Sequence, residues 1–227
     1  MQELDATTII FAALAIFVLF KLRSVLGTRT GEERPPFNPF ERRAPAEAEE
    51  GSNVIRMPGN GPAPQTPEQR WGDYGERYAF AGLEAIAAAD AQFNGKDFAN
   101  GARSAYEFIV TAFAQGNRDA LRDLLSADVF ENFEAAIAAR EERHEKSETH
   151  FVSIDKVWIE EAQLRDRTAQ VTVQFTSKII TVTRNAAGEV VDGSTDRIVD
   201  VVDVWTFARE AGASDPNWRL VATEAAH

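Results

Sequence analysis

The chain has 227 residues, no cysteine and a formal net charge of -12, with 36 acidic residues against 24 basic ones. The absence of cysteine excludes disulfides, thiolate nucleophiles and cysteine-ligated metals. Because no basic stripe exists to neutralise phosphates, the composition also argues against nucleic-acid binding.

The amino-terminal stretch is uncharged from Ala6 to Phe20. Its large apolar residues favour insertion into a bilayer by about 3 to 5 kcal/mol in total. These predicted anchor residues are Ile9, Ile10, Phe11, Leu14, Ile16, Phe17, Val18, Leu19 and Phe20. A cleaved signal peptide is disfavoured, because acidic residues precede the run and no small-residue cleavage site follows it. We predict a short tail over 1–5 and a transmembrane helix over 6–26; an interfacial or buried core helix is the alternative.

The orientation of this helix follows from its flanks. No basic residue precedes the span, whereas Lys21, Arg23, Arg29 and Arg34 follow it closely. Basic flanks stay on the cytoplasmic side of a membrane. The sequence therefore predicts a single span with the amino terminus outside and the carboxyl-terminal domain in the cytoplasm.

Residues 27–70 have the composition of a linker. Eight of the nine prolines lie between Pro35 and Pro67, together with an acidic cluster and several glycines. Such a segment cannot bury enough apolar surface to offset its ordering entropy. We expect a disordered, partly extended tether.

Helical periodicity extends from Trp71 to Lys146. The strongest segment places Phe98, Ala102, Ala105, Ile109, Ala112 and Phe113 on one helix face. We expect Asp97 to cap the start of this helix, Gly116 to end it, and Ser126 to cap a later one. We expect the charged run 140–146 to be a solvated tail.

From about residue 149 the periodicity changes to two, which is typical of strands. We expect strands near 151–159, 169–179, 198–208 and 218–223. The connections 185–194 and 211–217 are rich in Gly, Asn, Asp and Pro, as hairpin loops are. Helices followed by consecutive antiparallel strands predict one α+β domain over 71–227.

Five stretches of this domain resemble the Tim44-like domain family, which includes short, membrane-anchored bacterial proteins. They are DFANGARSAYEFIVTAFAQGNRDALRDLL (97–125), VTVQF (171–175), GEVVDG (188–193), DVWTFAR (203–209) and DPNWRLVAT (215–223). The family is named for a subunit of the mitochondrial presequence translocase. The resemblance implies location at a bacterial inner membrane.

The resemblance also implies a fold. We expect a nuclear-transport-factor-two-like cone, in which amino-terminal helices pack on a bent antiparallel sheet of about four strands and enclose an apolar cavity. In the mitochondrial protein, a separate amino-terminal region tethers a seventy-kilodalton heat-shock chaperone. The short Pro-rich linker of this chain lacks that region, so chaperone recruitment is not carried over.

No residue pattern indicates catalysis, a cofactor or a metal. The three histidines, His144, His150 and His227, do not lie on an apolar stripe that would line a pocket. We expect Tyr106 to be a core tyrosine with a satisfied hydroxyl. The odd separation of Asp200 and Asp203 places them on opposite faces of a strand, where edge solubility explains them.

The candidate apolar pocket consists of Phe98, Tyr106, Ile109, Phe113, Trp158, Phe175 and Trp205. Our leading hypothesis is a membrane-anchored, non-catalytic adaptor that binds inner-membrane or nascent membrane proteins, in relation to protein translocation. The alternative is a binder of a small hydrophobic ligand, such as a lipid or isoprenoid, or an enzyme acting on it. A third possibility is a scaffold that self-associates.

Overall fold

The computed structural model describes residues 65–225, so the predicted tail, transmembrane helix and most of the linker lie outside it. Within residues 65–225, no helix has the length and apolar character needed to cross a membrane. The first described helix already begins at Pro67, three residues before the predicted end of the linker.

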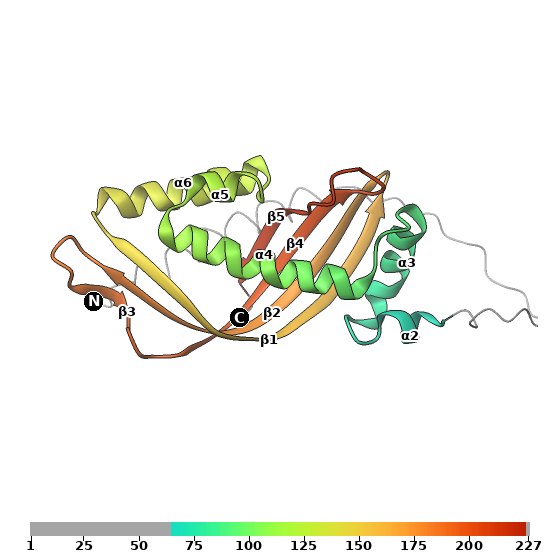
Figure 1. Cartoon of the computed structure of the whole chain (residues 1–227), viewed down its shortest axis with the longest axis horizontal. Coiled ribbons are helices and arrows are strands. Elements are labelled where there is room, and N and C mark those ends of the chain that lie inside the picture. The colour runs from blue at the N-terminus through green and yellow to red at the C-terminus, as the bar shows by residue number, and fades with distance from the viewer. Residues whose placement is uncertain (1–64, 226–227) are drawn as a thin grey trace, which may run out of the picture.

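Helices occupy the first half of the described chain and strands the second half (Figure 1). The helices are α2 (Pro67–Trp71), the 3-10 helix η1 (Arg77–Ala79), α3 (Phe80–Ala89), α4 (Gly95–Gln115), α5 (Arg118–Arg122) and α6 (Ala127–Glu142). The strands are β1 (Lys146–Arg165), β2 (Thr168–Arg184), β3 (Val190–Gly193), β4 (Val199–Glu210) and β5 (Arg219–Ala225). The predicted α+β class is confirmed.

The five strands form one antiparallel sheet in the order β1-β2-β4-β5, and β3 pairs with the far end of β2. The prediction of about four strands was wrong, because β3 lies inside the stretch 185–194 that we expected to be a loop. All four residues of β3 are exposed. A strand without a buried face gives no alternating pattern, so its turn-forming neighbours dominate the sequence signal.

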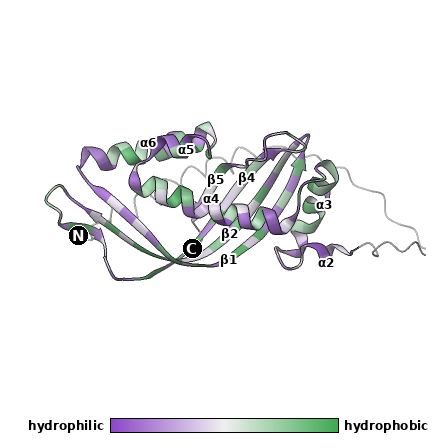
Figure 2. Ribbon diagram, viewed as in Figure 1, coloured by the Kyte–Doolittle hydropathy of each residue, from purple (hydrophilic) through white to green (hydrophobic). Residues whose placement is uncertain are grey.

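Helix α4 crosses the sheet with one buried face, as its periodicity predicts. Its buried residues include Phe98, Tyr106 and Ile109. They face the alternating buried residues of β2 and the buried Trp205 and Phe207 of β4. Figure 2 shows the same alternation of apolar and polar residues along the strands. The core of the domain therefore lies between α4 and the sheet.

The ends of α4 partly match the prediction. The predicted cap Asp97 was wrong, because Asn94 has the extended backbone of a cap and its side chain accepts from the Asp97 amide. Gly116 ends the helix with a left-handed φ of 71°, which confirms that expectation. Ser126 caps α6, also as expected.

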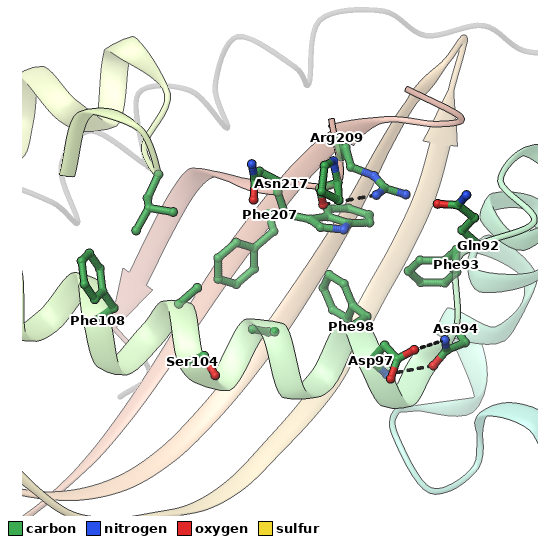
Figure 3. A pocket seen from close by; sticks show the side chains of 16 residues that line it. Gln92, Phe93, Asn94, Asp97, Phe98, Ser104, Phe108, Phe207, Arg209 and Asn217 are labelled. Carbon is green, nitrogen blue, oxygen red and sulfur yellow. Dashed lines mark hydrogen bonds between the residues drawn. The ribbon is translucent and has the colours of Figure 1, made fainter. Parts of the chain in front are cut away.

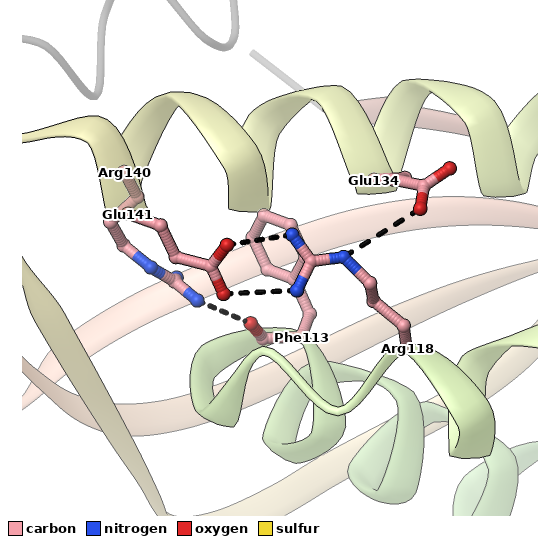
Figure 4. Close-up of polar contacts among 5 residues, drawn as sticks. All are labelled: Phe113, Arg118, Glu134, Arg140 and Glu141. Carbon is pink, nitrogen blue, oxygen red and sulfur yellow. Dashed lines mark hydrogen bonds and ion pairs between the residues drawn. The ribbon is translucent and has the colours of Figure 1, made fainter.

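An ionic clamp joins α6 to the segment that follows α4 (Figure 4). The Arg118 guanidinium donates two hydrogen bonds to the Glu141 carboxylate, at 2.9 and 2.8 Å. Arg140 donates to the carbonyl of Phe113 at 2.8 Å and lies over its ring. The expected solvated tail over 140–146 is confirmed in part. Residues 141–144 are exposed, whereas Arg140 packs on α4 and Lys146 begins β1.

Helix α3 approaches β1 closely at a glycine. A Cβ built on Gly82 would lie 1.8 Å from the carbonyl oxygen of Ala162, a backbone atom that cannot move aside. We expect Gly82→Ala to lower the free energy of unfolding by about 3 kcal/mol, the upper end of typical overpacking costs. Urea unfolding, followed by tryptophan fluorescence, measures this.

Gly101→Ala is the matched control, because a Cβ at Gly101 meets nothing within 4 Å. Alanine is favoured over glycine inside a helix by about 1 kcal/mol, so this variant should be as stable as the parent or more stable. Equal destabilisation by the two substitutions would contradict the close approach of α3 and β1.

Candidate functional site

A pocket of about 580 Å³ lies between the first half of α4, the end of β4 and the loop before β5 (Figure 3). Helix α4 contributes mainly small residues to it, among them Gly101, Ala102, Ser104 and Ala105. Because these side chains are small, they leave open a space that bulky side chains fill elsewhere in the core. The remaining lining residues are Gln92, Phe93, Asn94, Asp97, Phe98, Phe108, Leu124, Phe207, Arg209, Pro216, Asn217 and Trp218.

Aromatic rings form the wall of the pocket at its α3 end. The Phe98 and Trp218 rings meet edge to face with centroids 4.9 Å apart, and Phe93 lies 5.9 Å from Trp218. Phe98 also contacts Phe207 of β4 at 6.4 Å. These contacts tie α4 to β4 and to the loop before β5, so this wall is preformed.

A buried ion pair lies beside this wall. Arg209 pairs with Asp90, and their side chains are only 11% and 6% exposed. The guanidinium also donates to the carbonyl of Pro216 at 3.2 Å and lies over the Trp218 ring. Its Nε has no hydrogen-bond partner within the described part of the chain. The opposite charges of Arg209 and Asp90 neutralise each other, so the pair adds no net charge to the pocket.

The sequence analysis missed Arg209 and Asp90. One signal was available, since Arg209 continues the alternating series of Trp205 and Phe207 on the dry face of β4. A basic residue in that series implies a buried partner. Nothing in the sequence identifies Asp90 as that partner, because the two residues are 119 positions apart.

Only one of the seven predicted pocket residues, Phe98, lines this pocket. Tyr106, Ile109, Phe175 and Trp205 are buried in the core between α4 and the sheet. The other two are only partly buried. Phe113 packs against Phe133 of α6, at 4.9 Å between ring centroids. Trp158 donates from Nε1 to Glu76 at 2.9 Å.

Tyr106 forms a polar cluster inside the core. It is 1% exposed and stacks on Phe175 with ring centroids 4.3 Å apart. Its hydroxyl donates to Oδ2 of Asp203 at 2.7 Å and lies 3.1 Å from Oγ of Ser177. Burial raises the pKa of Tyr106 above its usual value. The expectation of a core tyrosine with a satisfied hydroxyl is confirmed.

The two aspartates of β4 lie on opposite faces, as their spacing predicts. Asp200 pairs with Lys178 at 3.1 Å on the exposed face. Asp203 faces Tyr106, and burial raises the pKa of its carboxyl. Edge solubility was the wrong explanation for Asp203, because β4 lies between β2 and β5 and is no edge strand.

The histidines do not contribute to the pocket. His144 and His150 are exposed, and His227 lies outside the described residues. Among residues 65–225, no group of three or more His, Cys, Asp and Glu side chains could hold a metal ion.

Comparison with known proteins gives a family match. The family described as the Tim44-like domain matches residues 79–225, which is most of the described chain. A search of curated proteins gives no match. Among solved structures, the intermembrane space region of the chloroplast protein ARC6 is similar, with 9% identity and a TM-score of 0.43. That similarity covers 59% of this chain and 97% of the other.

The buried carboxyl of Asp203 gives a pH-dependent prediction. Because its folded pKa is raised above the unfolded value of about 3.9, its stabilising contribution is complete below that pH and is lost as the pH rises through the folded pKa. An asparagine side chain carries no charge at pH 4 or at pH 7. We therefore expect Asp203→Asn to gain stability relative to the parent between about pH 4 and pH 7.

Urea unfolding of both proteins at the two pH values measures this difference. Asp200→Asn, on the exposed face of the same strand, is the control and should show no such gain. A stability difference for Asp203→Asn that does not change with pH, or that falls as pH rises, would show that Asp203 is not a buried carboxyl of raised pKa.

Proposed function

Because the chain belongs to the Tim44-like domain family, we propose that it is a non-catalytic adaptor related to protein translocation. Its pocket binds hydrophobic segments of membrane proteins or of nascent membrane proteins. The family match supports the translocation theme, and the pocket supports the mode of binding.

The observation that carries this proposal is an open, apolar pocket with an exposed aromatic residue at its edge. Phe108 lines the pocket and is 52% exposed. Large exposed apolar groups beside a preformed pocket are typical of surfaces that bind other molecules. A hydrophobic segment that covers Phe108 and enters the pocket would remove both surfaces from water.

The polar groups nearby favour binding over chemistry. Arg209 and Asp90 neutralise each other at the wall of the pocket. Tyr106 and Asp203 bond to each other in the core and are not among the residues that line the pocket. Neither pair presents an acid, a base or a nucleophile to a molecule inside the pocket.

The proposed location rests on the segment before the described domain. We propose that residues 6–26 anchor the chain in a bacterial inner membrane, with the domain on the cytoplasmic side. A membrane anchor with a linker raises the effective concentration of the domain near the bilayer to roughly millimolar. At that effective concentration, a pocket with low affinity is sufficient to bind its partner. The nuclear-transport-factor-two-like cone remains part of the same proposal.

A second candidate function is favoured by the size of the pocket. At about 580 Å³ it falls within the usual range for small-molecule sites, roughly 300 to 1,000 Å³. A lipid or isoprenoid chain would contact the aromatic wall, with Arg209 as its polar neighbour. Native mass spectrometry of the purified chain separates the two functions, since a bound acyl or prenyl mass favours this one.

Photo-crosslinking in cells tests the adaptor function. We expect benzoylphenylalanine at Phe108 to form crosslinks with membrane proteins or nascent membrane proteins, because that side chain borders the pocket. Tyr78 is the matched control, an aromatic residue that is 70% exposed and does not line the pocket. Products are identified by mass spectrometry after purification of the full-length chain.

The same partners at positions 108 and 78 would show that the pocket has no part in binding. Crosslinks from position 108 that join only two copies of this chain would also contradict the adaptor function.

A further inference from the structure

The two ends of the pocket differ in their chemistry (Figure 3). At the end next to α3, the lining carries four polar side chains, two of them charged. At the other end, α4 contributes the apolar residues Ala105 and Phe108. Along the helix axis, Phe108 lies eleven residues, or about 16 Å, from Asp97 at the polar end. Ser104 and Asn217 are the other polar residues of the lining. The residues of the polar end are Gln92, Asn94, Asp97 and Arg209.

Both charged residues of the polar end already have partners. Arg209 pairs with Asp90. Asp97 accepts a hydrogen bond from Nδ2 of Asn94 and lies in the first turn of α4, where the helix dipole favours a negative charge. A charged head group of either sign would therefore meet a like charge at this end, and the opposite charge there is already paired. Taking such a group out of water would cost free energy that these contacts do not return.

Gln92 offers uncharged hydrogen-bonding atoms at the same end. Its backbone N–H donates to Oδ1 of Asp90 at 3.0 Å, which holds the residue beside the ion pair. Its side chain lines the pocket and makes no hydrogen bond to another residue among 65–225. A side-chain amide both donates and accepts, so it can bind a hydroxyl or an amide of a ligand. A few such polar groups fix the orientation of a ligand in a mainly apolar pocket.

We propose that the pocket binds an apolar chain that ends in an uncharged hydrogen-bonding group, such as a long-chain alcohol or a fatty amide. The head group lies beside Gln92, and the chain runs along α4 past Ala105 toward Phe108. This proposal rests on the second candidate function, the binding of a small hydrophobic ligand in the pocket. It narrows that ligand to lipids and isoprenoids without a charged head, and so excludes fatty-acid anions and prenyl phosphates.

Three probes with the same decyl chain test the charge of the head group: decan-1-ol, decyl sulfate and decylammonium. Equilibrium dialysis measures their binding to the full-length chain in phosphatidylcholine nanodiscs. The same measurement on Ala105→Trp, whose indole fills the pocket, is subtracted, because it gives the uptake of each probe by the lipid. We expect decan-1-ol to bind about tenfold more tightly than either charged probe. Equal binding of the three probes, or tighter binding of a charged one, overturns the proposal.

A variant of Gln92 tests where the head group lies. We expect Gln92→Leu to weaken the binding of decan-1-ol about fivefold, the effect of losing one hydrogen bond. Gln115→Leu is the matched control, since Gln115 is exposed at the end of α4 and does not line the pocket. Urea unfolding checks that both variants and Ala105→Trp fold. An unchanged affinity of Gln92→Leu for decan-1-ol overturns the placement of the head group beside Gln92.

These measurements also separate the proposal from the adaptor function. If no probe binds more to the parent than to Ala105→Trp, the proposal fails, whereas protein crosslinks from position 108 would still support the adaptor. Pocket binding of decan-1-ol without protein crosslinks from position 108 supports the proposal and contradicts the adaptor. Pocket binding of a charged probe as tight as that of decan-1-ol overturns the proposal and leaves ligand binding in the pocket standing.

Discussion

The packing of α4 on β2 and β4 is the constraint on which the other features of this domain depend. Where the helix face carries bulky residues such as Tyr106 and Ile109, helix and sheet fill the space between them. On the neighbouring side of the helix, Gly101, Ala102 and Ala105 are small, so the space there stays open and becomes the pocket. Core and pocket thus lie on neighbouring faces of one helix, the first lined by bulky residues and the second mainly by small ones. The pocket is therefore built into the fold and needs no movement to form.

The buried polar groups near this pocket are paired with one another. Tyr106, Ser177 and Asp203 bond to one another between α4 and the sheet. Arg209 and Asp90 neutralise each other at the wall, with Trp218 against the guanidinium. Buried polar groups without partners are costly, so this pairing lowers the cost of burying these groups. A site of this kind can hold hydrophobic groups in place, as the proposed adaptor function requires.

Local signals in the sequence were sufficient for much of the fold. The face of α4, the left-handed Gly116 and the cap Ser126 depend on residues close in sequence and were predicted correctly. The pocket was not, because periodicity shows which side of a helix is buried and does not show whether the opposing side chains fill the space. Large aromatic residues such as Phe175 and Trp205 were therefore assigned to a cavity, whereas they pack in the core. The Arg209 and Asp90 pair depends on contact between distant segments, which a single sequence does not reveal.

The central claim is that the pocket beside α4 is the working surface of this protein. Rescue of cells that lack the chain by a pocket-filled variant tests it most directly. Ala105→Trp places an indole in the pocket from the helix side, and Val191→Trp adds the same group to an exposed position on β3. The account predicts that, at equal protein levels, Ala105→Trp fails to restore function and Val191→Trp restores it. Full rescue by Ala105→Trp would contradict the account.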